Sequence, residues 1–121
     1  MTTLLIVDDS TYNRKLVKKI FAKMDFTFLE AINGREALTI IDETAIDCIL
    51  LDLMMPVMDG FHFLESIYNS EIAIPVIVAT ADIQAETERE CLAMGVSRVL
   101  HKPLNAAALQ AAVLEVLGCS G

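Results

Sequence analysis

The amino-acid sequence predicts an α/β fold, a doubly wound parallel sheet of five strands with five helices. The first observation behind this prediction is that short runs rich in Val, Ile and Leu recur along the chain, at residues 3–7, 27–31, 46–51, 75–79 and 97–101. The second is that a stretch with helical spacing of apolar residues follows each run. Because each helical crossover returns the chain to the same end of the sheet, this alternation predicts parallel strands covered by helices on both faces.

The first helix shows this spacing clearly. Its apolar positions recur three and four residues apart, at Tyr12, Leu16, Val17, Ile20, Phe21 and Met24. The opposite face is predicted to carry five of the nine basic residues: Arg14, Lys15, Lys18, Lys19 and Lys23. Ser10 or Thr11 can accept hydrogen bonds from the first backbone amides, so we expect the helix to begin there.

Capping residues and glycines delimit the other four helices. Asn33 and Asn105 are suited to cap the second and fifth helices, and Gly95 favours the end of the fourth because glycine readily adopts a left-handed backbone. The second helix is expected to open at Asn33-Gly34 and run through about Glu43, and the third to follow Gly60 and end near Asn69. The fourth is expected from near Ile83 to Gly95, and the fifth from Ala106 to Leu117.

The composition indicates one globular domain spanning residues 1–121. Hydrophobic residues make up 55% of the chain and charged residues 21%, a balance that supports a packed core. The apolar runs are far shorter than the roughly 20 residues that a membrane-spanning helix needs, and the N-terminus lacks the pattern of a secretory signal. We therefore expect a cytoplasmic protein with no membrane partner. The net charge of -8 argues against direct binding of nucleic acid, which depends on neutralising phosphates with Lys and Arg.

The cysteines do not indicate a metal or redox site. Cys48, Cys91 and Cys119 are odd in number and lack the paired spacing of a structural zinc site. We expect three reduced thiols, with Cys48 and Cys91 serving as small buried hydrophobic residues.

Polar residues follow four of the predicted strands at the point where each strand ends. Asp8 and Asp9 follow the first strand, Asp52 ends the third, Thr80 ends the fourth and Lys102 ends the fifth. Ligands of open α/β sheets bind at the edge formed by the carboxyl ends of the strands. One acid or hydroxyl in a loop is ordinarily a helix cap or a solvated group, but a set converging from four strands predicts a functional site.

These residue types suit phosphoryl transfer. Three crowded carboxylates repel one another unless a counter-charge is present, and Mg²⁺ prefers oxygen ligands completed by waters and a phosphate oxygen. A carboxylate can act as the nucleophile and form an acyl phosphate. The three phosphoryl oxygens would then be contacted by Mg²⁺, Lys102 and Thr80.

Four motifs resemble the receiver domain of two-component response regulators, in that family's order and spacing. They are Ile6-Val7-Asp8-Asp9-Ser10, Leu51-Asp52-Leu53-Met54-Met55-Pro56 with Asp59-Gly60, Val78-Ala79-Thr80-Ala81, and His101-Lys102-Pro103. The resemblance covers nearly the whole chain. It implies the flavodoxin-like strand order 2-1-3-4-5, which would set the first and third strands side by side.

The resemblance also implies a role for each site residue. Asp52 would accept a phosphoryl group from a sensor histidine kinase or a histidine phosphotransfer protein. Mg²⁺ would be bound directly by Asp9 and Asp52, by Asp8 largely through a water molecule, and by the backbone carbonyl of Met54. Lys102 would contact the phosphoryl group, and its peptide bond to Pro103 would be cis. The domain would promote its own phosphorylation and dephosphorylation without being an enzyme for a separate substrate.

Phosphorylation is expected to change what the domain binds, with a homodimer of phosphorylated copies as one outcome and an unidentified downstream target as another. The basic face of the first helix has two interpretations, a solvated surface or a docking site for an acidic phosphodonor protein.

The sequence departs from the family at Val99, three residues before Lys102, where many receivers carry an inward-turning Tyr or Phe. A loop shift at Thr80 is still expected, but the aromatic that usually transmits it to the surface of the fourth helix, fifth strand and fifth helix is missing. His101, on the same strand face as Val99, is interpreted as an ordinary exposed histidine, with a pH-sensitive surface as the alternative.

Three other functions share some of these features. An aspartyl-phosphate hydrolase uses the same residue types, but its nucleophile usually ends the first strand in an Asp-x-Asp pattern, whereas Asp8 and Asp9 are adjacent. A flavin-binding module would need a loop rich in Ser, Thr and Gly to cradle a phosphate, which the sequence lacks. The third alternative is a receiver-like scaffold that is never phosphorylated.

Overall fold

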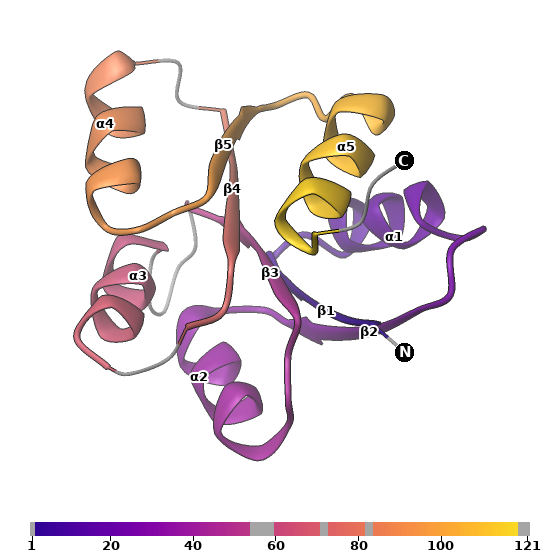
Figure 1. Ribbon diagram of the computed structural model, residues 1–121, viewed down its shortest axis with the longest axis horizontal. Coiled ribbons are helices and arrows are strands. Elements are labelled where there is room, and N and C mark those ends of the chain that lie inside the picture. The colour runs from indigo at the N-terminus through magenta and orange to yellow at the C-terminus, as the bar shows by residue number, and fades with distance from the viewer. Residues whose placement is uncertain (1, 54–59, 71–72, 82–83, 119–121) are drawn as a thin grey trace.

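The computed structural model describes residues 2–53, 60–70, 73–81 and 84–118, in which strands and helices alternate strictly (Figure 1). None of the helices in these residues is both long and apolar enough to cross a membrane. The strands are β1 (Thr2–Val7), β2 (Phe26–Ala31), β3 (Cys48–Asp52), β4 (Val76–Thr80) and β5 (Arg98–His101). The helices are α1 (Thr11–Ile20), α2 (Gly34–Glu43), α3 (Gly60–Tyr68), α4 (Ala85–Ala93) and α5 (Ala106–Val116).

The strands form one parallel sheet in the order β2-β1-β3-β4-β5, which confirms the order implied by the resemblance. β1 pairs with β3, and Val7 at the end of β1 lies opposite Leu51. The chain therefore changes direction across the sheet between β1 and β3, the position at which α/β sheets bind their ligands.

Helices cover both faces of the sheet. α2, α3 and α4 pack on one face and α1 and α5 on the other (Figure 1). Successive residues of β1 alternate between these layers, since Leu5 and Val7 join the first core and Leu4 and Ile6 the second. Every residue of β3 and β4 is buried, which explains why these central strands are continuous apolar runs in the sequence.

Most helix ends follow the sequence prediction. Ser10, Asn33 and Asn105 each accept a hydrogen bond from the backbone amide three residues later, at 3.2, 2.8 and 2.9 Å. Gly95 follows the last turn of α4 with φ +87°, a backbone conformation that glycine adopts without strain. The expected start of that helix at Ile83 lies outside the described residues.

Three local predictions were wrong. α1 ends at Ile20, four residues before Met24, because the chain turns at its C-cap, Phe21. Tyr12 is 74% exposed rather than part of the apolar face. It lies five residues before the buried Val17, about 140° around a helix of 3.6 residues per turn, and so outside the buried stripe. β3 begins two residues later than predicted, although Ile46 still packs in the core.

Cys48 and Cys91 are buried free thiols, as predicted. Burial raises the pKa of Cys48 to about 12, and burial also raises the pKa of Cys91, with acidic neighbours adding to both effects. A thiol with a raised pKa carries little thiolate at neutral pH, so both side chains act as apolar core residues. Cys119 lies outside the described residues.

Candidate functional site

The loop between β1 and α1 carries two of the predicted site residues and is held at several points. The backbone amide of Asp8 donates to the carbonyl of Ala31 at 3.0 Å, which fastens the loop to the end of β2. Asp8 Oδ1 accepts a hydrogen bond from the amide of Ser10 at 2.9 Å, and Ser10 in turn caps α1. Asp8 is therefore buried in a fixed position, whereas its neighbour Asp9 is exposed.

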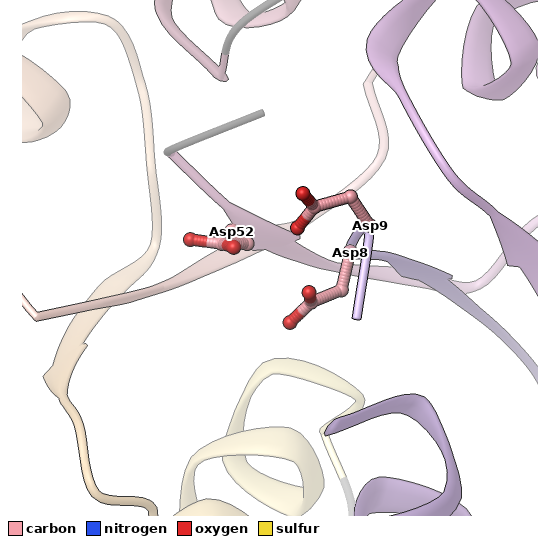
Figure 2. A group of neighbouring side chains, drawn as sticks. All are labelled: Asp8, Asp9 and Asp52. Carbon is pink, nitrogen blue, oxygen red and sulfur yellow. The ribbon is translucent and has the colours of Figure 1, made fainter. Parts of the chain in front are cut away.

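Three carboxylates meet where β1 and β3 end. Asp8, Asp9 and Asp52 can each offer one oxygen such that these oxygens all lie within 4.8 Å of one another. Figure 2 shows Asp52 on the end of β3, with the Asp9 side chain directed toward it from the β1 side. Only 8% of Asp52 is exposed. The strand order thus brings together acids that are separated by more than forty positions in the sequence.

Lys102 supplies positive charge to this cluster. Its ammonium nitrogen lies 3.4 Å from Asp8 Oδ2 and 3.5 Å from Asp52 Oδ2. The backbone amide of Lys102 donates to the carbonyl of Thr80 at 2.8 Å, so the loop after β5 is fastened to β4. The Lys102–Pro103 peptide is cis, as expected. One ammonium therefore lies among three carboxylates.

Thr80 ends β4 beside this cluster. It is fully buried, and the residue before it, Ala79, lies opposite Asp52 in the register of β3 and β4. The ends of the four strands named from the sequence therefore lie along one edge of the sheet. The predicted backbone ligand, Met54, is outside the described residues.

The three acids fit a small divalent cation. Mg²⁺ takes oxygen ligands at about 2.1 Å in an octahedron, so its ligands lie about 3 to 4 Å from one another. Carboxylate oxygens already within 4.8 Å need only small side-chain rotations to reach that spacing. Carboxylates outnumber the Lys102 ammonium in this cluster, a charge balance that suits a divalent cation.

Arg14 is a site neighbour that the sequence reading missed, because helical spacing placed it on the solvated basic face. Its guanidinium turns back onto the acid-bearing loop and donates to the carbonyl of Asp8 at 2.7 Å. It also pairs with Glu30 on β2 at 3.0 Å. A helical wheel indicates which face a residue occupies, but not which loop a long side chain can reach.

Gly60 has a role beyond starting α3. Its amide donates to the carbonyl of Leu53 at 2.8 Å. A Cβ atom at this position would lie 2.5 Å from the Leu53 Cα and 3.1 Å from the carbonyl oxygen of Asp52. Only glycine allows α3 to approach the end of β3 so closely. The Asp59-Gly60 motif was the available signal, although Asp59 itself is not among the described residues.

Val99 occupies the position where the expected aromatic is missing. It is half-buried, lies opposite Val78, and packs against the core shared with α3 and α4. His101, two residues later in β5, is exposed and lies opposite Thr80. The inward position of β5 is therefore filled by a small aliphatic side chain.

Comparisons with known proteins agree with this geometry. Residues 4–114 match the family model of the response regulator receiver domain. The chain is 34% identical over 107 residues to the sensor histidine kinase RcsC of Salmonella typhi, covering 88% of this chain and 11% of that protein. It is 36% identical over 102 residues to the regulatory protein AtoC of Escherichia coli, covering 84% of this chain and 22% of that protein. The chain thus spans only a small part of these relatives.

Solved structures give the same result. The receiver domain of the Francisella response regulator 1452 superposes with a TM-score of 0.92 at 29% identity, covering 98% of each chain. The strand order, the acid cluster and the family match over residues 4–114 agree with one another. The chain therefore belongs to the receiver domain family of response regulators, which acts in phosphorylation-dependent signalling.

Proposed function

We propose that residues 1–121 form one receiver domain in which Asp52 accepts a phosphoryl group in a Mg²⁺-dependent reaction. The observation that carries this proposal is the placement of Asp52 at the end of β3, within the cluster of three acids and 3.5 Å from the Lys102 ammonium. A buried carboxylate beside a cation and two further acids has the parts that phosphoryl transfer to an aspartate requires.

Asp8, Asp9 and Asp52, with the Met54 backbone carbonyl, would hold Mg²⁺. When bound, the ion supplies positive charge to the phosphoryl oxygens. A carboxylate oxygen of Asp52 attacks phosphorus, an oxygen–phosphorus bond forms, and the bond from phosphorus to the donor's histidine nitrogen breaks, leaving its electron pair on that nitrogen. Lys102 contacts a phosphoryl oxygen, and the Thr80 hydroxyl contacts another.

The domain acts on its own aspartate, so it promotes its phosphorylation and later dephosphorylation while serving as a signalling switch. Its phosphodonor is a histidine kinase or a histidine phosphotransfer protein, in keeping with relatives that are sensor kinases and regulators. We place this exchange in the cytoplasm. The output is a change in binding, either to a downstream target or to a second phosphorylated copy.

Incubation with acetyl phosphate tests the proposal directly. With Mg²⁺ present, intact-mass measurement should detect one added phosphoryl group per chain, because the small donor needs no docking surface. Chelation with EDTA should abolish the adduct, and added Mg²⁺ should restore it. An unmodified mass in saturating Mg²⁺ would sink the proposal, and release of phosphate from many unrelated monoesters would favour a hydrolase instead.

The basic face of α1 is proposed as the docking site for the phosphodonor protein. Lys15 and Lys19 are exposed one turn apart, beside the exposed Tyr12, whereas Lys18 is paired with Glu30 at 3.0 Å. Reversing the charge of Lys15 and Lys19 to Glu should slow transfer from an acidic phosphotransfer protein about 10-fold at low salt, through loss of electrostatic steering.

The rates of transfer from the donor protein and from acetyl phosphate, measured side by side, check this prediction. The acetyl phosphate rate should not change. A matched control with the same change in net charge is Arg35→Glu with Arg89→Glu, since both arginines are exposed on other helices. Equal slowing with both donors would show that the α1 lysines are not a docking site.

A further inference from the structure

We propose that Arg14 is a positioning residue of the phosphoryl site, because its guanidinium clamps the acid-bearing β1–α1 loop to β2. This inference rests on the proposed function and adds a residue that contacts neither the metal nor the phosphoryl group. It assigns Arg14 a different role from the exposed lysines of the same helix.

The clamp consists of three hydrogen bonds from one side chain. Arg14 Nη1 donates to the carbonyl of Asp8 at 2.7 Å, and Nε donates to Glu30 Oε1 at 3.0 Å. The third nitrogen, Nη2, lies 3.3 Å from the hydroxyl of Thr11. Only 12% of the Arg14 side chain is exposed. This arginine is therefore anchored, unlike a surface side chain that samples several rotamers.

Glu30 fixes the other end of the clamp. It lies on β2, next to Ala31, whose carbonyl accepts the hydrogen bond from the Asp8 amide. Its second oxygen accepts a hydrogen bond from Lys18 Nζ at 3.0 Å. Hydrogen bonds from Lys18 and Arg14 hold the pKa of Glu30 below its ordinary value, against the opposing effect of burial. Glu30 is thus ionised at neutral pH and can hold both cations.

The result is that both backbone polar groups of Asp8 have a partner on another element. The amide is bound to β2, and the carbonyl is bound through Arg14 to α1 and β2. That carbonyl belongs to the peptide that leads into Asp9, the exposed acid of the cluster. Fixing this peptide sets the direction from which the Asp9 carboxylate reaches the ion. Residues that orient metal ligands commonly affect metal affinity 10-fold or more.

The shape of the side chain matters as much as its charge. A guanidinium offers several N–H groups in one rigid plane, so it can bind the Asp8 carbonyl and the Glu30 carboxylate at the same time. A lysine ammonium keeps the charge without the planar fork. Arg14→Lys therefore separates the effect of charge from the effect of geometry.

If only charge mattered, replacing Arg14 would change the Mg²⁺ affinity in the opposite direction. A positive group near a cation site repels the cation, so removing Arg14 would strengthen Mg²⁺ binding if only Coulomb forces mattered. If Arg14 holds the loop in place, its replacement should weaken Mg²⁺ binding, because the freed loop must be ordered when the ion binds. The direction of the change in Mg²⁺ affinity therefore distinguishes the two accounts.

The experiment measures the Mg²⁺ dissociation constant by isothermal titration calorimetry for wild type, Arg14→Ala and Arg14→Lys. We expect both variants to bind Mg²⁺ about 10-fold more weakly. The control is Arg35→Ala, an exposed arginine on α2, which should bind Mg²⁺ as the wild type does. Circular dichroism at the titration temperature ensures that only folded variants are compared. Unchanged or tighter Mg²⁺ binding in both folded Arg14 variants would overturn the clamp.

A double-mutant cycle with Glu30→Gln tests whether the two residues act together. Glu30→Gln alone should weaken Mg²⁺ binding, and it should add little in the Arg14→Ala background, because the clamp is already broken. Fully additive effects would contradict a shared clamp. Failure of the proposed function is recognised separately, since wild type would then form no acetyl phosphate adduct in Mg²⁺ whatever the Arg14 variants do.

Discussion

Replacing Asp52 with Asn is expected to abolish phosphorylation, whichever donor is used. The amide has nearly the same shape as the carboxylate but lacks the anionic oxygen that attacks phosphorus. Intact-mass measurement after incubation with acetyl phosphate and Mg²⁺ should show the unmodified mass. Asp8 and Asp9 remain in the variant, so the experiment also tests whether either of them can substitute as acceptor.

The matched control is Asp42→Asn on α2, where the carboxylate is exposed and belongs to no site described above. This variant should form the adduct at the wild-type rate. An adduct of equal yield in Asp52→Asn would place the phosphoryl group on another residue, which peptide mapping would then identify.

Asp52→Asn should also stabilise the protein when no metal is present. Three carboxylates within 4.8 Å repel one another, and the Lys102 ammonium offsets only part of that repulsion. Removing one negative charge should raise the free energy of unfolding in EDTA by about 1 kcal/mol. Added Mg²⁺ should stabilise wild type more than the variant, because the ion binds the native acid cluster. Urea denaturation with and without Mg²⁺ measures both effects.

Hydrophobic patterning was sufficient to predict the alternation of strands and helices, because each element buries a continuous apolar stripe or run. Hydrophobic patterning could not give the order of the strands in the sheet, because the apolar pattern of a strand does not indicate which strand pairs with it. The order 2-1-3-4-5 was implied by the resemblance to receiver domains, and the observed strand pairings confirmed it. Once the order is known, the meeting of Asp8, Asp9 and Asp52 follows from the parallel direction of the strands.

The roles of Arg14 and Gly60 were not predicted from the sequence, and the physical reason is the same for both. Arg14 and Gly60 act through contacts with the backbone of another segment, at the carbonyl of Asp8 and at Leu53. Such contacts depend on how closely two elements approach, which apolar spacing does not encode. Tyr12 shows the reverse error, since it was predicted to be a core residue but lies outside the buried stripe.

Val99 affects how a conformational change at the phosphorylation site could reach the surface of the domain. It packs inward against the α3 and α4 side of the core, on the strand next to the one that ends in Thr80. A half-buried valine has no long side chain to turn between core and surface. We therefore expect the response to phosphorylation to involve displacement of the loops that carry Thr80 and Lys102 more than a rotamer change at position 99.

Gly60→Ala is expected to destabilise the fold and disable the site together. The added methyl group would lie 2.5 Å from the Leu53 Cα and 2.8 Å from its side chain, so the backbone after Asp52 must move. Inserting a carbon into a packed contact costs about 2 kcal/mol in the free energy of unfolding. For a chain of this size that corresponds to a fall in Tm of about 8 °C. Because Leu53 directly follows Asp52, the proposed acceptor, the rate of phosphorylation by acetyl phosphate should fall as well.

Gly95→Ala separates these two effects. Gly95 has φ +87° with open space around the Cβ position, so alanine there is strained without contacting a neighbour. Its cost, about 1 kcal/mol, arises from the left-handed backbone alone. Both variants should melt earlier than wild type in a thermal scan, but at a temperature where each is folded only Gly60→Ala should lose adduct formation and Mg²⁺ affinity. Wild-type phosphorylation in folded Gly60→Ala would mean that the close approach of α3 to β3 serves stability and does not position Asp52.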